Sequence, residues 1–343
     1  MGDVTGRDLV VVAASAGGVE SLRSLLKDLP GDLEAAVLVV LHISPRGGSA
    51  LPGILDRAGP LTAVAAENDA ILKHGTVYVA PPDHHMLVRG DRVVLSRGPR
   101  HNGHRPAADP LFLSAALAGG RRTLAVVLSG TLDDGARGCG VVERHGGAVA
   151  IQDPDESAFD GMPRAALAVA ERPMVGTVTR IARWITRESR TPVGAEAETA
   201  DPEIEREVSA HVSVRGAGPP DGEISTFTCP ECNGPLFEAQ GRDGARYECL
   251  VGHSWSMNGM VDGQAEAVER AFWVAILRLE ERMRISRRMI TGFEQRGQRA
   301  SARRMYEQVR QDEEALVILR DLQTKIRSAD EGSPIAPGDE TRR

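Results

Sequence analysis

Residues 9–18 read LVVVAASAGG, an apolar run that ends in a turn of small residues. The β-branched residues of the run predict a buried strand over 9–13. A leucine repeat with helical spacing follows Gly18, so the turn joins a strand to a helix. Ser15 therefore lies at a helix start, where backbone N–H groups lack intrahelical partners and the helix dipole is positive. It is either a helix cap or a nucleophile whose oxyanion those N–H groups stabilise.

The composition of the 343-residue chain indicates a layered α/β protein. Hydrophobic residues make up 41% and aromatic residues only 3%, so Ala, Val, Leu and Gly carry the packing. The net charge of −7 provides no general attraction to nucleic acid or anionic membranes. Apolar runs such as 35–41 are too short to span a bilayer, and charged residues near the start exclude a secretory signal. We therefore expect a cytoplasmic protein that neither binds nucleic acid nor inserts into a membrane.

Expected strands and helices alternate through the first half of the chain, which predicts a doubly wound, mostly parallel sheet with helices on both faces. We expect an antiparallel addition at one sheet edge over 78–96. The expected strands are 9–13, 36–41, 62–66, 76–80, 123–128 and 148–151, with a hairpin over 86–96. The expected helices are 19–29, 49–57, 109–117, 136–144, 163–170 and 177–187.

The composition changes after Arg187, which indicates further parts of the chain. We expect a catalytic domain, a linker with one short helix near 202–210, a cysteine-bearing module, a helical hairpin and a disordered tail. These parts span 1–188, 189–222, 223–258, 259–328 and 329–343. The hairpin, which turns near Gly297, is either a small packing unit or a surface for homo-oligomerisation. The linker composition predicts that the catalytic domain needs no contact with the cysteine module.

Polar side chains follow three of the expected strands. Ser15 follows the first strand, His42 the second, and Asp133 and Asp134 the strand 123–128. Parallel strands end at the same sheet edge, so these side chains are candidates for a nucleophile, a general base and an orienting carboxylate. Each alone also fits a structural role, as a cap, a buried histidine or a turn. No Gly-x-Ser-x-Gly elbow or glycine-rich phosphate loop is present, which disfavours an α/β-hydrolase or a nucleotide site.

Six sequence blocks, in order, resemble the catalytic domain of the chemotaxis protein-glutamate methylesterase family, the CheB type. They are AASAGGVESL (13–22), VVLHISP (39–45), GTVYVAPPDHHM (75–86), RPAADPLFLSAA (105–116), LSGTLDDGARG (128–138) and AIQDPDESAFDGMPRAAL (150–167). The resemblance covers roughly residues 8–188 and implies a catalytic triad of Ser15, His42 and Asp134. Asp133 is the alternative carboxylate.

The resemblance implies hydrolysis of glutamate γ-methyl esters on a methylated, chemoreceptor-like protein, and deamidation of glutamine by the same route. No cofactor is needed for this catalysis. Ala16, Gly17 and Thr131 would border the oxyanion, and Met162, with Arg164, would shape the pocket wall. The alternatives are a serine hydrolase of this fold acting on another ester or amide, and a catalytically weak scaffold that binds partners through its C-terminal parts.

The chain departs from the family pattern at three points. Ala16 stands where family members usually have Thr, and Gly130-Thr131-Leu132 stands where they usually have Gly-Met-Gly. Both changes would border the oxyanion region and alter its donors. The sequence also begins directly on the catalytic strand, without the family's receiver domain, so we do not expect control by aspartyl phosphorylation within this chain.

Several residues near these blocks have two interpretations. The loop 97–105 carries three arginines, His101 and His104, and it either meets an acidic substrate or is a solvated loop. His84 and His85 either line the cleft or belong to a turn. Cys139 is expected to be a small buried residue.

A Cys-x2-Cys pair and a Cys-x3-His pair, sixteen residues apart, follow the linker. The four residues are Cys229, Cys232, Cys249 and His253. Three thiols and one imidazole at this spacing are typical of a closed structural zinc site. A module this short buries too little to fold alone, so we expect zinc to supply its folding energy; the alternative is a ribbon without metal. Acidic residues around the ligands disfavour nucleic-acid binding.

Overall fold

Strand β1 (Leu9–Ala14) lies at the centre of the largest sheet, and all six of its side chains are buried. Alternate side chains enter two separate cores, because successive residues of a strand point to opposite faces. Leu9, Val11 and Ala13 belong to one core, and Val10, Val12 and Ala14 to the other. This computed structural model describes residues 6–43, 49–194, 201–212, 220–241 and 244–330.

The described strands of this sheet run parallel in the order β3-β4-β2-β1-β7-β8-β9. The strands are β2 (Ala36–Leu41), β3 (Thr62–Ala65), β4 (Thr76–Val79), β7 (Thr123–Val127), β8 (Ala148–Gln152) and β9 (Met174–Gly176). Strands β2 to β4 lie on one side of β1 in the sheet, and strands β7 to β9 lie on its other side. The switch point between β1 and β7 is where open α/β sheets hold their sites, at the carboxyl ends of the strands.

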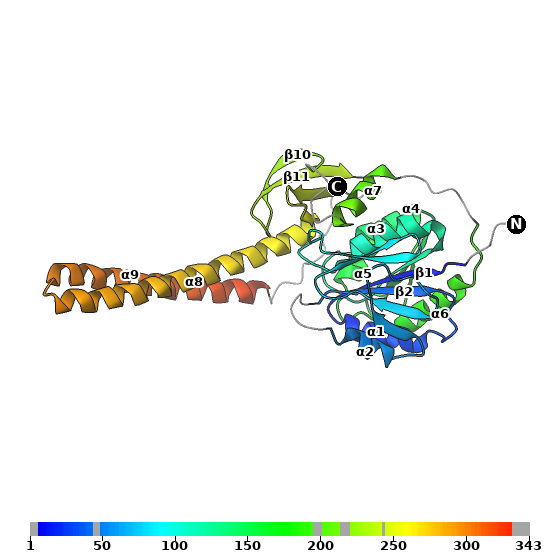
Figure 1. Ribbon diagram of the computed structural model, residues 1–343, viewed down its shortest axis with the longest axis horizontal. Coiled ribbons are helices and arrows are strands. Elements are labelled where there is room, and N and C mark those ends of the chain that lie inside the picture. Colours follow the sequence, from blue (N-terminus) through cyan, green and yellow to red (C-terminus); the bar gives the residue numbers. More distant parts are fainter. Residues whose placement is uncertain (1–5, 44–48, 195–200, 213–219, 242–243, 331–343) are drawn as a thin grey trace, which may run out of the picture. The chain divides into compact units, whose positions relative to one another are not determined.

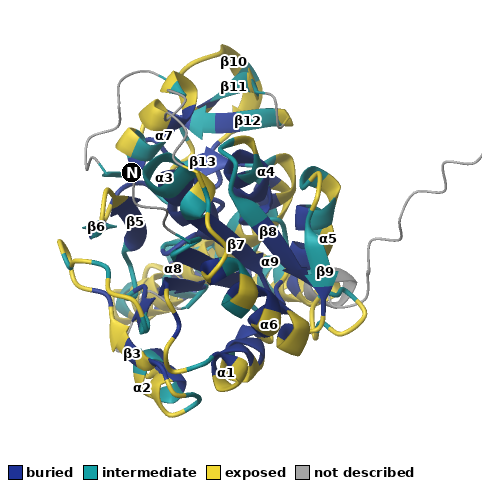
Figure 2. Cartoon of the chain, turned by 90° about the vertical axis from the view of Figure 1, so that its right-hand side faces the viewer, coloured by how far each residue is buried: buried dark blue, intermediate teal, exposed yellow. Residues whose placement is uncertain are grey.

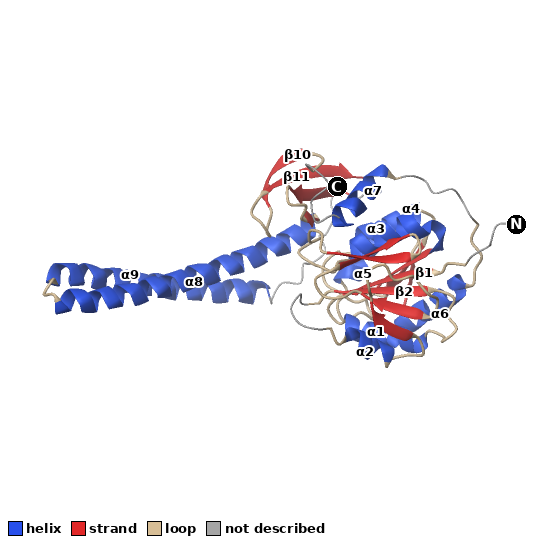
Figure 3. Cartoon of the chain, viewed as in Figure 1, coloured by secondary structure: helices blue, strands red, loops and turns tan. Residues whose placement is uncertain are grey.

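Helices cover both faces of the sheet (Figures 1 and 3). One core holds side chains of α1 (Gly18–Asp28), α2 (Leu51–Asp56) and α6 (Val178–Ser189). The opposite core holds α3 (Ala108–Gly119), α4 (Ala136–Arg144) and α5 (Gly161–Val169), with a 3-10 turn at Gly120–Arg122 before β7. The doubly wound parallel architecture expected from the sequence is therefore confirmed, and Figure 2 shows its buried strands.

Two details of the sheet differ from expectation. The hairpin of β5 (His85–Arg89) and β6 (Arg92–Ser96) forms a separate two-stranded sheet and does not extend the edge of the main one. Its apolar side chains, Met86, Val88 and Val93, are buried in the core of α3, so the hairpin covers a face. Strand β9 was not expected, because only three residues form it.

Part of the expected linker is packed helix. Helix α7 (Pro202–Val212) lies within the expected span 189–222 and corresponds to the short helix expected near 202–210. Ile204, Glu207 and His211 are buried, and Ile204 belongs to the core of α3. The expectation that this segment only separates two modules is wrong, because residues 1–263 form one compact unit.

The cysteine-bearing segment forms a four-stranded antiparallel sheet. Its strands are β10 (Glu223–Thr228), β11 (Pro235–Gly241), β12 (Gly244–Cys249) and β13 (Ser254–Trp255). The buried cluster is small: Cys229, Leu236, Tyr247, Cys249, Trp255 and Met260. We call residues 223–258 the ribbon.

The second compact unit spans residues 264–343 and contains two long antiparallel helices. Helix α8 (Met257–Gln295) begins in the first unit and α9 (Arg299–Asp330) returns after a turn at Gly297, whose φ is 71°. Ion pairs Arg282–Asp312 and Glu280–Arg320 join the helices, so the expected hairpin is present. Residues 331–343 of the expected disordered tail lie outside the described part of the chain. No helix within the described ranges has the length and apolarity needed to cross a bilayer.

Candidate active site

Ser15 and His42 directly follow two adjacent strands, β1 and β2, whose last residues pair with each other. Ala14 pairs with Leu41 at the ends of β1 and β2, and the His42 N–H donates to the Ala14 carbonyl at 3.2 Å. On the other side, the Ser15 N–H donates to the carbonyl of Ser129 after β7 at 3.0 Å. Main-chain bonds to both neighbouring strand ends therefore hold the serine at the switch point.

Asp134 is the carboxylate that reaches the histidine. His42 Nε2 lies 2.7 Å from Asp134 Oδ2, and both side chains are buried. Burial opposes ionisation of Asp134, but the hydrogen bond and charge of His42 outweigh it, so its pKa lies below the usual range. Asp133, the alternative carboxylate, instead accepts a hydrogen bond from Ser256 Oγ at 3.0 Å. Asp134 is therefore ionised and placed to orient the imidazole.

Both oxygens of Asp134 also bind the start of helix α3. The Ala108 N–H donates to Oδ2 at 2.6 Å and the Asp109 N–H donates to Oδ1 at 3.0 Å. First-turn N–H groups lack intrahelical partners, and the positive end of the dipole favours an anion there. The helix start thus stabilises the carboxylate and fixes the plane in which it meets His42.

A second imidazole–carboxylate pair lies behind the first. His101 Nε2 is 3.2 Å from Asp109 Oδ2 and 4.0 Å from Asp134 Oδ1, and all three side chains are buried. Burial alone would lower the pKa of His101, but the hydrogen bond and charge of Asp109 and the charge of Asp134 raise it. Burial raises the pKa of Asp109, and the His101 bond opposes that shift. A cationic His101 would compensate the negative charge that two buried carboxyl groups accumulate.

His104 covers the face of the candidate general base. Its ring stacks on that of His42 with centroids 4.0 Å apart and an interplanar angle of 10°. Burial, followed by the charge of His42, lowers the pKa of His104 to about 4. His104 is therefore neutral at pH 7 and provides a flat contact that limits movement of the catalytic ring.

Met162, one of the expected pocket residues, lies across Gly130 from Ser15. A Cβ added to Gly130 would lie 2.9 Å from Ser15 Cβ and 2.1 Å from Met162 Sδ, so only glycine fits between them. Gly17 begins the turn before α1 with φ 70°. Thr131 is exposed beside this site, and the next residue, Leu132, has φ 67°, a strained conformation for leucine.

The side chain of Ser129 supports the same turn. It donates to the Ala16 carbonyl at 2.8 Å and accepts from the Phe159 N–H at 3.0 Å. Ala16 and Gly17 are thus held where first-turn N–H groups of α1 can meet a ligand.

Other residues singled out from the sequence make separate contacts. Arg164 is exposed and pairs with Asp160. His85 is buried with Nε2 2.9 Å from the Pro99 carbonyl, whereas His84 bonds the Pro82 carbonyl of its own turn. Cys139 is buried, as expected.

The charged side chains of the loop 97–105 pair with other parts of the first unit. Arg97 and Arg105 pair with Asp83, and Arg100 pairs with Glu231 of the ribbon. Its two histidines turn inward to Asp134 and His42. The two histidines of the loop therefore belong to the interior of the site, whereas the Arg97 side chain is exposed.

Sequence reasoning named His101 and His104 in the loop but missed their contacts with Asp134 and His42, and it missed Asp109 altogether. The signal was His101-Asn102-Gly103-His104, an Asn-Gly dipeptide between two histidines. Asn102 and Gly103 have φ of 47° and 75°, and the flanking residues exchange backbone hydrogen bonds. Asn-Gly favours such two-residue turns, which place the flanking residues opposite each other. No comparable pattern marks Asp109.

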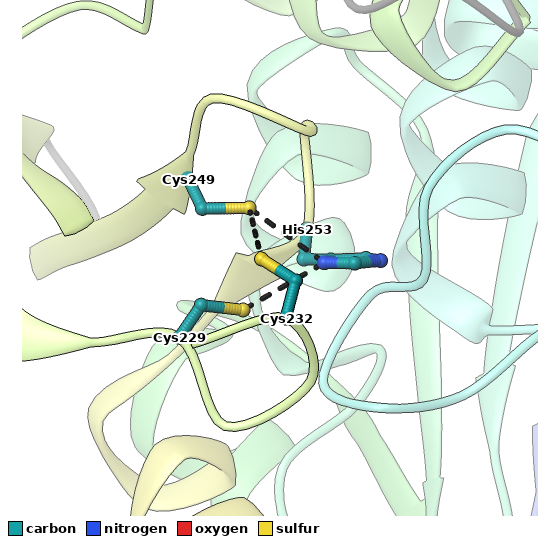
Figure 4. A group of neighbouring side chains, drawn as sticks. All are labelled: Cys229, Cys232, Cys249 and His253. Atoms are coloured by element: carbon teal, nitrogen blue, oxygen red, sulfur yellow. Dashed lines mark hydrogen bonds between the residues drawn. The ribbon is translucent and has the colours of Figure 1, made fainter. Parts of the chain in front are cut away.

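The four candidate zinc ligands converge in the ribbon (Figure 4). Sγ of Cys249 lies 3.6 Å from Sγ of Cys232 and 3.6 Å from Nδ1 of His253. Nδ1 of His253 also lies 3.7 Å from Sγ of Cys229. Zinc–sulfur bonds of about 2.3 Å at tetrahedral angles separate two sulfurs by about 3.8 Å. Disulfide sulfurs would be only about 2 Å apart. The donor types and spacing therefore fit a zinc ion.

Two other buried groups contain possible metal donors, and both include His101. One adds Glu207 and His211, and the other adds Asp109 and Asp134. Both ring nitrogens of His101 already have partners, Ser254 and Asp109. Glu207 is neutralised by Arg137 and Arg246, each 2.6 Å from Oε2. The donor atoms of His101 and Glu207 Oε2 are thus already engaged, whereas Glu207 Oε1 and His211 Nδ1 are buried without a hydrogen-bond partner among the described residues.

Residues 10–185 match the family model described as CheB methylesterase. A protein-glutamate methylesterase/protein-glutamine glutaminase of Pyrococcus abyssi is 36% identical over 188 residues, which are 54% of this chain and 51% of that protein. The chain spans about half the length of that relative. A Leptospira interrogans protein described as a putative protein-glutamate methylesterase/protein-glutamine glutaminase is 32% identical over 181 residues. The match covers 52% of this chain and 94% of that protein. The crystal structure of the Thermotoga maritima CheB methylesterase catalytic domain matches with a TM-score of 0.50 and 31% identity, over 52% of this chain and 97% of that one.

Proposed function

This chain belongs to the CheB methylesterase family, and we propose that its N-terminal domain hydrolyses glutamate γ-methyl esters on a chemoreceptor-like protein through Ser15, His42 and Asp134. The observation that carries the proposal is the buried contact of 2.7 Å between His42 and Asp134, beside a serine that continues the adjacent strand. A nucleophile, a base and an orienting carboxylate at one strand edge are the parts that acyl transfer requires.

The reaction proceeds in two halves. Ser15 Oγ attacks the ester carbonyl while His42 takes the serine proton. Because Asp134 holds Nε2, His42 uses Nδ1 for this transfer. The tetrahedral intermediate collapses to an acyl-serine, and His42 gives the proton to the departing methoxide, which leaves as methanol. Water then attacks the acyl-serine with His42 as base, and the glutamate carboxylate and Ser15 are released. Attack on a glutamine side chain by the same route releases ammonia in place of methanol.

The oxyanion would be stabilised by N–H groups at the start of α1, around Ala16 and Gly17, and by the loop that contains Thr131. Met162 packs against Gly130 on the other side of Ser15 and would form the wall along the ester methyl group. Each hydrogen bond to a developing oxyanion contributes about 3–4 kcal/mol in other acyl-transfer enzymes. The turn geometry around Gly17 and Gly130 is therefore essential to the proposed rate.

We also propose one structural zinc ion in the ribbon, bound by Cys229, Cys232, Cys249 and His253. Zinc binds cysteine as the thiolate, so the ion would displace the protons that the three thiols carry in its absence. The ion supplies folding energy to a small module, and the proposed hydrolysis needs no cofactor. Elemental analysis of protein purified without chelator should find about one zinc per chain, and absence of stoichiometric metal would contradict the site.

Methanol release tests the esterase. The purified chain should release methanol from a chemoreceptor fragment methylated on glutamate side chains, and Ser15→Ala should abolish the release. Ser24→Ala, on the exposed face of α1, is the matched control and should leave the rate unchanged. Equal rates for wild type and Ser15→Ala would exclude the triad. Activity on simple esters but not on the methylated protein would favour a serine hydrolase with another substrate.

Homo-oligomerisation through the C-terminal helices is a further proposal. Described residues of the second unit expose large apolar side chains, including Trp273, Val274, Leu277, Val317 and Ile318. Exposed apolar side chains along a helix pair favour burial against another surface. Light scattering should find a dimer or larger species that Trp273→Glu with Leu277→Glu dissociates, and a monomeric wild type would exclude it.

A further inference from the structure

The segment that follows ligand His253 lies against the loop that carries the second histidine pair. Ser254 forms a bridge with His101: its N–H donates to the Arg100 carbonyl at 3.2 Å, and its carbonyl accepts from the Asn102 N–H at 2.9 Å. Ser254 Oγ and His101 Nδ1 are 2.8 Å apart. Both side chains are buried, so this contact excludes water and fixes the ring of His101.

His101 continues this contact to the triad. Its Nε2 faces Asp109 and Asp134, and Asp134 meets His42. A chain of hydrogen bonds and one close charge contact thus leads from the residue after a zinc ligand to the candidate general base. Only Asp134 separates His101 from His42.

A second contact reaches the same loop. Ser256 Oγ donates to Asp133 at 3.0 Å, and the Ser256 N–H donates to Asn102 Oδ1 at 2.8 Å. The fit is close, since a Cβ on Gly252 would lie 2.7 Å from Pro99 and a Cβ on Gly259 would lie 2.5 Å from Asn102 Oδ1. The ribbon therefore holds both the residue before Asp134 and the turn before His104.

The position of Ser254 depends on the metal knuckle. The Gly252 N–H donates to the Cys249 carbonyl and the Cys249 N–H to the His253 carbonyl, so ligands and bridge share one tight turn. The buried cluster of the ribbon contains only six side chains, two of them ligands. Without an ion, little else would hold this turn in place.

We propose that the Cys3His knuckle is a positioning element of the active site. It holds Ser254 against His101, and His101 in turn positions Asp134 relative to His42. The proposal rests on the proposed function of the triad. His101 and Ser254 are positioning residues, because they act through Asp134 and touch no reacting atom. A zinc site outside the catalytic domain thereby determines how well the serine is activated.

Labelling of Ser15 by a fluorophosphonate probe tests this inference in the full-length chain, because the rate depends on serine activation and not on the protein substrate. Ser254→Ala removes one hydroxyl but keeps both backbone bonds. We expect it to slow labelling about 10- to 100-fold, as small displacements of catalytic groups do. Cys232→Ser, or removal of the metal by a chelator, should slow it at least as much, and added zinc should restore the chelated protein. Thr226→Ala, exposed on the same ribbon, is the matched control.

Two readouts separate positioning from simple unfolding. Mispositioning lowers the rate constant and changes the pH profile of labelling while all molecules are eventually labelled; unfolding lowers the final labelled fraction. Hydrogen exchange at the Asn102 and Ser254 amides should rise on metal removal, with β1 still protected. Wild-type rates and pH profiles in Ser254→Ala and in the metal-free chain would overturn the inference alone. Failure of wild type to label at Ser15 would overturn the proposed triad and this inference with it.

Discussion

The serine end and the aspartate end of the proposed triad are held in different ways. Ser15 and His42 extend neighbouring strands, and main-chain bonds to Ala14 and Ser129 hold them. Asp134 is held by side chains and helix ends from distant parts of the chain, including the start of α3, His101 and, through it, the ribbon. The nucleophile is therefore as rigid as the central sheet, whereas the carboxylate depends on how later segments pack. The aspartate end is the end through which activity can be adjusted.

Asp134→Asn should have the largest effect on activity. The amide cannot stabilise an imidazolium and favours the wrong tautomer of His42. The same change in serine proteases lowers kcat by about 10⁴-fold. We expect a loss of that order in methanol release, with the circular dichroism of the sheet unchanged. Asp133→Asn is the control, and a loss as large there would move the carboxylate role to Asp133.

Glu207→Gln tests the packing behind the aspartate end. Glu207 on α7 joins Arg137 of α4 to Arg246 of β12, and all its ion-pair contacts are buried or half-buried. Removing its charge takes the nearest anion from two half-buried guanidinium groups, whose contacts to Glu203 and Glu248 are longer, at 3.7 and 3.8 Å. Urea unfolding of the first unit should therefore show a loss of about 3 kcal/mol. Glu203→Gln, half exposed and 3.7 Å from Arg137, should cost less than about 0.5 kcal/mol.

The pH dependence of this variant follows from the same ion pairs. Burial raises the pKa of Glu207, but Arg137 and Arg246 outweigh it and lower it to about 2. Because the folded-state pKa is the lower one, the ionised carboxylate stabilises the folded state fully above the unfolded-state pKa of about 4.5. This stabilisation is lost as the pH falls from about 4.5 to 2. The stability difference between wild type and Glu207→Gln should therefore shrink over this range. A constant difference would indicate that packing, not charge, is lost.

His104, which packs at the aspartate end of the triad, should make the free energy of unfolding depend on pH in mild acid. Its pKa is about 4 in the folded chain and about 6.5 when unfolded, so the unfolded state binds the proton first. The neutral His104 ring therefore makes its full contribution to the free energy of unfolding above pH 6.5, and this contribution is lost as the pH falls toward 4. Because buried His85 and His211 contribute to the same slope, the comparison is with His104→Phe, which keeps the ring but does not titrate. Between pH 6.5 and 4 wild type should lose about 1–2 kcal/mol more than the variant, and parallel profiles would contradict the assignment.

Ser129→Ala should have the smallest effect, because main-chain bonds also hold the serine end. The change removes the hydroxyl contacts to Ala16 and Phe159 and should cost about 1–2 kcal/mol of unfolding free energy. The Ser15 N–H keeps its bond to the residue-129 carbonyl, so methanol release should fall less than about tenfold. A loss comparable with that of Asp134→Asn would show that the serine end is equally dependent on side chains.

Much of the fold and half of the site could be read from local patterns. The strand before Ser15, the helix after it and the alternation of later elements predicted a parallel sheet, because apolar periodicity and glycine-marked turns act within a few residues. Ser15 and His42 were predictable for the same reason, since each is the first residue beyond a buried strand. The separate β5–β6 sheet was not, because an apolar hairpin can extend an edge or cover a face equally well.

The sequence by itself determined that a sheet of this kind forms, that Ser15, His42 and the pair Asp133 and Asp134 follow three of its strands, and that four zinc-type donors follow in paired spacing. Only the tertiary structure decided that His101 and Asp109 lie behind Asp134, that α7 packs into the core of α3, and that Ser254 meets His101. Those contacts join residues up to 153 positions apart. No local repeat encodes such pairs; they arise when separate surfaces bury their polar groups against one another and each buried donor must find an acceptor.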